Sequence, residues 1–133
     1  FPDQGINISQ MASSISDSSK YDVFDLSNAF ISGNKERTAN VLESLKAEGA
    51  PETLILWSLS RELTNLFKVM NQKTTKGIWG PRHYLNNLEK LAKQVAISDL
   101  KHALQQVAKI DASIKGSSQQ DSWQAIRELT LTF

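Results

Sequence analysis

The segment PETLILWSLSRELTNLFKVMNQ, residues 51–72, limits the possible folds of this chain more than any other stretch. Its leucines recur at intervals of three and four residues, which is the spacing of one face of an α-helix. Further apolar side chains lie off that face, so neighbours must cover the helix on more than one side. The segment therefore predicts a central helix, with Leu56, Leu59, Leu63, Leu66 and Met70 on its main stripe and Leu54, Ile55, Trp57 and Phe67 beside it.

Helical periodicity also fills most of the chain on either side of this segment, with Gly, Asn and Pro at the breaks. Gly33 and Asn34 form a short hinge between two helical patterns, which predicts a helical hairpin. Strand signals are weak, because only the terminal LTLTF alternates and it has no partner. We predict an all-α bundle of about six helices: one in 22–34, one in 35–48, one in 51–72, one from Pro81 or Arg82, one capped by Ser98 and ended by Gly116, and a last one with Trp123, Ile126 and Leu129.

The composition is that of an ordinary soluble domain, with 133 residues, 40% of them hydrophobic and 22% charged. The net charge of +1 excludes a strongly basic nucleic-acid arm and an acidic tail. The absence of cysteine excludes disulfides, cysteine zinc sites and thiol nucleophiles. No apolar run approaches the roughly 20 residues that cross a bilayer, and the start FPDQGINISQ is not a signal peptide. Because the start also lacks an initiator Met, we expect a longer natural chain.

The octapeptide GIWGPRHY, residues 77–84, concentrates residue types that are common in active sites. A phosphate cradle is disfavoured, because no Lys-Ser/Thr pair follows the glycines and Pro81 lacks one backbone N–H that such a loop would use. We expect instead that the glycines form a turn, that Pro81 begins a helix and that Arg82 lies in its first turn. Trp79 and Tyr84 are expected to pack on the core.

Other catalytic and metal-binding patterns are also disfavoured. The two histidines, His83 and His102, lie on different predicted helices and have no acidic residue three or four positions later. Asp22 and Asp25 lie at a helix start, where acids stabilise the helix dipole without any catalytic chemistry. No GxGxxG, GxxxxGK[ST] or GxSxG motif is present. We predict a chain without a catalytic site, metal or cofactor, and assign no role to His83.

The adjacent charges Arg61 and Glu62 are unusual because they lie on the most apolar predicted helix. Arg61 falls off the main leucine stripe. One explanation is a solvated helix face. The other is a subunit interface, where arginine is favoured and can pair with a carboxylate of the neighbour. The sequence leaves both explanations open.

Taken in order, several segments resemble the C-terminal part of the delta subunits of bacterial DNA polymerase III clamp loaders. They are YDVFDLSNAFISGN, VLESLKAEG, LILWSLSRELTNLF, IWGPRHYL, IDASIKG and DSWQAIRELTL. Their order and spacing carry the resemblance over residues 8–133. The resemblance implies a remnant of an AAA+-type helical lid domain in residues 1–20 and a helical collar domain in residues 21–133.

The resemblance also implies a function. In that family the delta subunit has no working ATP site, and its N-terminal domain, absent here, opens the sliding clamp. The collar packs against the ATP-binding gamma/tau-type subunits and delta-prime, and the whole complex holds primed DNA. We therefore predict a cytoplasmic, non-enzymatic subunit-assembly module of the clamp loader, with no membrane partner. The candidate interface or structural anchors are Trp57, Arg61, Glu62, Trp79, Arg82 and Trp123.

An alternative function is a helical nucleic-acid-binding module. Lys68, Lys73, Lys76 and Arg82 form a modest basic cluster around the break between two predicted helices. The near-zero net charge and the lack of aromatic residues between these basic residues argue against strong binding. An enzyme of unknown class is a third alternative, which no constellation of residues supports.

Overall fold

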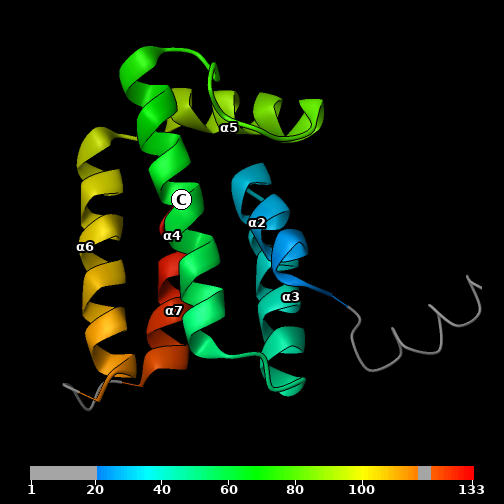
Figure 1. Cartoon of the computed structure of the whole chain (residues 1–133), viewed down its shortest axis with the longest axis vertical. Coiled ribbons are helices and arrows are strands. Elements are labelled where there is room, and N and C mark those ends of the chain that lie inside the picture. Colours follow the sequence, from blue (N-terminus) through cyan, green and yellow to red (C-terminus); the bar gives the residue numbers. More distant parts are fainter. Residues whose placement is uncertain (1–20, 117–120) are drawn as a thin grey trace, which may run out of the picture.

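Helix α4, Glu52–Gln72, is the longest helix in the computed structural model, which describes residues 21–116 and 121–133. It contacts α2, α5, α6 and α7. In Figure 1, α6 runs beside α4 on one side, α2 and α3 lie on the other, and α5 crosses one end. The other helices are α2 (Val23–Ser32), α3 (Lys35–Ala47), α5 (Arg82–Gln94), α6 (Ile97–Ile114) and α7 (Ser122–Thr130).

The predicted all-α bundle with a central helix is confirmed, since the described residues form these six helices and no strand. The core lies around α4, whose Leu59, Leu63 and Leu66 are fully buried. Each neighbouring helix buries its own apolar face against α4 or against a helix next to it. The predicted lid remnant, residues 1–20, lies outside the described residues.

The α2–α3 hairpin forms as predicted, and its ends follow from local chemistry. Asp22 and Asp25 form a capping box, in which each carboxylate accepts the backbone N–H of the other residue. Gly33 ends α2 with φ 79°, a left-handed conformation that favours glycine. The Asn34 side chain then accepts the Arg37 N–H at 3.0 Å and caps α3.

The connection between α4 and α5 is held by the end of α4 itself. Lys73 takes a left-handed conformation with φ 64°, and its N–H donates to the Val69 carbonyl at 2.8 Å. The Gln72 side-chain amide donates to the carbonyl oxygens of Thr74 at 2.9 Å and Lys76 at 2.7 Å. These bonds fold the chain back toward α4 and set the position of the segment that precedes α5.

Candidate functional site: a groove over a buried carboxylate

The carboxylate of Glu62 lies in the interior, where only 1% of the residue is exposed. The Tyr84 hydroxyl donates a hydrogen bond to it, and the Asn65 amide donates to the Tyr84 oxygen at 3.0 Å. The Ser27 side chain of α2 also hydrogen-bonds to Glu62, and the hydroxyls of Ser27 and Ser58 lie 3.5 Å apart. The buried polar cluster of Glu62, Tyr84, Asn65 and Ser27 therefore joins α2, α4 and α5.

The electrostatics of this cluster follow from burial. Desolvation raises the pKa of Glu62, while hydrogen bonds from Tyr84 and Ser27 and the nearby charge of Arg61 act in the opposite direction. Burial, together with the bond to Glu62 and its charge, raises the pKa of the Tyr84 phenol. The phenol therefore stays protonated and remains a hydrogen-bond donor to Glu62 at neutral pH.

Glu62 lies neither on a solvated face nor on an exposed interface, the two explanations that the sequence left open for the Arg61–Glu62 pair. Its burial is compatible with the other half of the prediction, a structural anchor. The signal for this burial was present in the sequence. Glu62 follows Leu59 by three residues and precedes Leu66 by four, so it shares the helix face of two fully buried leucines. Its partner Tyr84 faces the core as predicted and is 5% exposed.

A groove of about 300 Å³ opens above this cluster, and we call it the Trp79 groove. Phe24 and Trp79 line it with apolar surface, Arg61 contributes a cation, and Glu62 and Tyr84 lie beneath. Exposed aromatic side chains and one guanidinium group meet here, and both residue types are enriched at protein interfaces. Among the residues that the structure describes, no acidic side chain other than Glu62 lines the groove.

Trp79 does not pack on the core, contrary to the prediction from sequence, and is 85% exposed. The preceding residue, Ile78, takes the inward position and packs against the core instead. Gly80 follows, and a Cβ atom there would lie 2.6 Å from Cδ2 of the Tyr84 ring. The ring of Tyr84 thus occupies the space beside this segment, and the Trp79 indole points to solvent.

The other predicted site residues of this end of the bundle are mostly exposed. Trp57 is 55% exposed, and the Arg61 guanidinium lies 5.9 Å from the centre of its ring. Arg82 and His83 are exposed in the first turn of α5. The structure thus brings Arg61 and Trp79 to one groove, and Trp57 lies beside Arg61.

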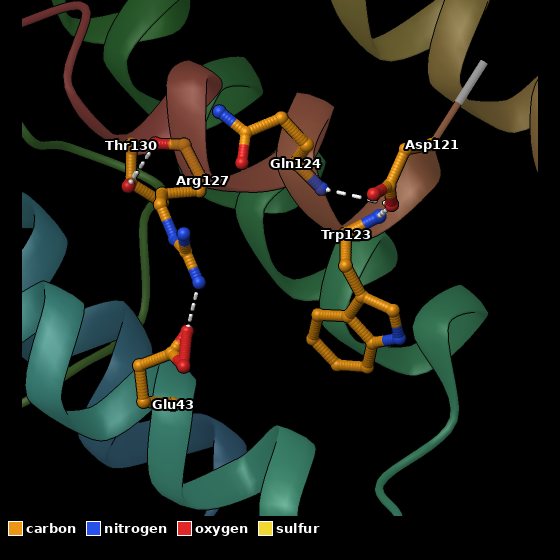
Figure 2. A network of polar contacts seen from close by, with 6 residues as sticks. All are labelled: Glu43, Asp121, Trp123, Gln124, Arg127 and Thr130. Atoms are coloured by element: carbon orange, nitrogen blue, oxygen red, sulfur yellow. Dashed lines mark hydrogen bonds and ion pairs between the residues drawn. The ribbon is translucent and has the colours of Figure 1, made fainter.

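Trp123 lies in a different environment, at the contact of α7 with α3. It is half-buried against the core, and Lys46 Nζ lies 5.8 Å from the centre of its ring. Figure 2 shows Arg127, one turn farther along α7, paired with Glu43 of α3. Sequence analysis did not identify this pair, because nothing in the spacing of residues far apart in the chain indicates that α3 and α7 meet.

The three lysines of the predicted basic cluster, Lys68, Lys73 and Lys76, are exposed. None of the ion pairs found within residues 21–116 and 121–133 involves them. The same part of the chain holds no group of three or more His, Asp or Glu side chains that could bind a metal ion. No helix described here is long and apolar enough to cross a membrane.

No family model matches the chain. The chain is similar to DNA polymerase III subunit delta of Escherichia coli (strain K12). The two sequences are 20% identical over 140 residues, and the similar region covers 98% of this chain. The chain spans only 40% of the length of that relative.

Proposed function

We propose that this chain is the collar domain of a clamp-loader delta subunit and serves to assemble the loader in the bacterial cytoplasm. The observation that carries the proposal is the similarity to DNA polymerase III subunit delta, which covers 98% of the chain. The all-α fold supports it, since the collar domains implied by the resemblance are helical bundles. The role needs no catalytic site in this chain.

The proposed mechanism is mechanical. The bundle has one continuous core around α4, so it moves as a unit and can transmit movements of its neighbours. Exposed aromatic side chains such as Trp57 and Trp79, next to Arg61, have the composition typical of protein interfaces. This domain would be held in a ring by its neighbours, the ATP-binding gamma/tau-type subunits and delta-prime. The sliding clamp would be bound by a domain outside this chain.

Reconstitution tests this proposal directly. The 133-residue chain is mixed with the ATP-binding subunits and delta-prime of the same organism and analysed by size-exclusion chromatography with light scattering. We expect the chain to elute with the assembled subunits at a mass that includes one copy of it. Elution of the chain by itself from every mixture would overturn the proposal.

A second candidate function, contact with primed DNA, rests on the exposure of Lys68, Lys73 and Lys76 near the end of α4. Phosphate contacts by a few lysines give weak binding that falls steeply with salt. Fluorescence anisotropy with a primer-template between 50 and 200 mM salt tests this function. A triple Lys→Gln variant with an unchanged binding curve would exclude these lysines as the contact.

A further inference from the structure

One face of α4 is not covered by any helix of the described chain, although α4 is the centre of the bundle. The five residues on this face, at positions 54, 57, 61, 64 and 68, are spaced at intervals of three, four, three and four. This is the spacing of the contact face between two packed helices. Four of the five residues are exposed, and Arg61 is partly exposed. We call this face the α4 stripe: Leu54, Trp57, Arg61, Thr64 and Lys68.

The α4 stripe changes character along its length. Its first half is apolar, with Leu54 41% and Trp57 55% exposed. Its second half is basic, with Arg61 and Lys68. Thr64 lies between these two and donates its hydroxyl proton to the Ser60 carbonyl at 2.9 Å. The stripe therefore offers apolar surface at one end and positive charge at the other.

The positive charges of the α4 stripe have no carboxylate within 4 Å among residues 21–116 and 121–133. Glu62 is the nearest acidic residue in sequence to Arg61, but it points into the core and is bonded to Tyr84. By contrast, Arg127 and Lys115, on α7 and at the end of α6, each pair with a carboxylate of the same chain. The stripe is thus complementary to a negatively charged surface.

The side of the α4 stripe that faces α2 and α5 is also apolar. Phe24 of α2, 60% exposed, and Trp79 line the same groove as Arg61. Six large hydrophobic residues of the described chain are exposed, and four of them lie on the stripe or in the adjoining groove: Leu54 and Trp57 on the stripe, and Phe24 and Trp79 in the groove. Such a concentration of large apolar side chains on one face is typical of an interaction site.

We infer that the α4 stripe docks a helix of another protein, one whose contact face is apolar at one end and acidic at the other. The inference rests on the proposed function, for which it names the docking surface and the chemistry of the partner. The partner's apolar residues pack on Leu54 and Trp57, and its carboxylates pair with Arg61 and Lys68. Helices that meet along such a seam cross at about 20° and lie about 8–10 Å apart. Phe24 and Trp79 then cover one side of the docked helix.

Two variants of the α4 stripe and two matched controls test this inference in the reconstituted loader. Trp57→Glu and Arg61→Glu change the apolar half and the basic half, respectively. Leu131→Glu and Lys109→Glu introduce the same charge at exposed apolar and basic positions far from the stripe along the chain. We expect each stripe variant to weaken assembly at least tenfold and each control to assemble like the wild type, with thermal melting showing that all four fold.

A synthetic helix tests the same chemistry without the loader. The probe is a fluorescein-labelled helical peptide with leucines opposite Leu54 and Trp57 and glutamates opposite Arg61 and Lys68. A second peptide carries lysines in place of the glutamates. In anisotropy titrations we expect the glutamate peptide to bind the wild type at least tenfold more tightly than the lysine peptide. Arg61→Glu should abolish that preference, because the stripe then carries one negative and one positive charge.

The outcomes separate the two proposals. Assembly of the wild type with unchanged assembly of both stripe variants would leave the proposed function standing and overturn the docking inference. Failure of the wild type to assemble would overturn the proposed function, and the peptide titration alone would then decide the inference. A dimer of the chain alone that Trp57→Glu dissociates would show that the stripe binds a second copy, which also overturns the inference.

Discussion

Trp123 on α7 and Trp79 before α5 both lie near an arginine, but their surroundings differ. Trp123 packs on the core under Lys46, and Arg127 of the same helix pairs with Glu43 (Figure 2). Trp79 is exposed, and Arg61 of its groove has no carboxylate within 4 Å in the described part of the chain.

This difference indicates that the same residue types stabilise the fold in one region and are available for binding in the other. Side chains that meet their partners within the chain contribute to the stability of the fold, so their loss should appear in unfolding experiments. Exposed side chains without internal partners contribute little to folding, so their loss should appear in binding. The predictions below test that division, beginning with the buried cluster beneath the Trp79 groove.

The largest effect is expected at Tyr84. Tyr84→Phe removes the hydroxyl that donates a hydrogen bond to the buried Glu62 carboxylate. The carboxylate then stays buried with one hydrogen-bond donor fewer. We expect a loss of about 2–3 kcal/mol in the free energy of unfolding, measured by urea denaturation. In a Glu62→Met background the same change should cost much less, and equal losses in both backgrounds would contradict the proposed pairing.

The two tryptophans give the most direct comparison. Trp123→Ala removes a half-buried ring from the core and should lower the free energy of unfolding by about 2 kcal/mol. Trp79→Ala should change it by less than about 0.5 kcal/mol, because the indole is exposed. Chemical denaturation of both variants measures the difference. If Trp79→Ala were the more destabilising of the two, the division between side chains that stabilise the fold and exposed side chains that act in binding would be wrong.

Glu62 should also give the stability a distinctive pH dependence. Its pKa is raised in the folded protein above the ordinary value of 4.5, so the folded chain holds this proton to a higher pH than the unfolded chain does. The stabilisation is complete below pH 4.5 and is lost as the pH rises toward the folded pKa, with a slope of at most about 1.4 kcal/mol per pH unit.

Comparison of the wild type with Glu62→Gln isolates this contribution, because all other titrating groups are shared. Urea denaturation from pH 4 upward should show the stability of the wild type falling relative to that of the variant. Tyr84, Ser27 and the Arg61 charge are the groups that act on Glu62 in the opposite sense. A constant difference between the two proteins at every pH would show that folding does not raise the pKa of Glu62.

The smallest effect is expected from the Arg127–Glu43 pair, although it is the most visible polar contact of the α7 region. Its side chains are 39% and 51% exposed, and exposed ion pairs contribute about 0.5 kcal/mol. Arg127→Ala should lower stability by that amount in low salt and by less in 1 M salt. A salt-independent loss above about 1.5 kcal/mol would mean that the arginine stem, not the charge pair, stabilises the α3–α7 contact.

The helices could be predicted from sequence because their signals are local. The leucine spacing of α4, the Asn34 cap and the Gly33 end each depend on residues within a few positions, and all three are confirmed. Helix boundaries differ more from the prediction. The fifth predicted helix begins at Ile97 with Ala96 as its N-cap, so Ser98 is not the capping residue. Short-range chemistry fixes where helices exist, while tertiary contacts adjust their ends.

The candidate site could be predicted only in part. Trp57, Arg61 and Trp79 were identified as site residues, but the inward direction of Glu62 and the outward direction of Trp79 were not. The burial of Glu62 could have been predicted from its helix face, but its charge favoured an exposed position. The direction of Trp79 depends on how Gln72 holds the segment 73–81, and that segment has no periodicity from which a direction follows.

Gly80 lies between the protein surface and the buried Tyr84 ring, and it has no side chain to fill the space between them. On one side lies the exposed indole of Trp79, and on the other the Tyr84 ring and the carboxylate that its hydroxyl bonds. A methyl group at position 80 would push that ring and strain its bond to Glu62. Position 80, half-exposed as it is, should therefore tolerate substitution less well than the fully exposed positions around it.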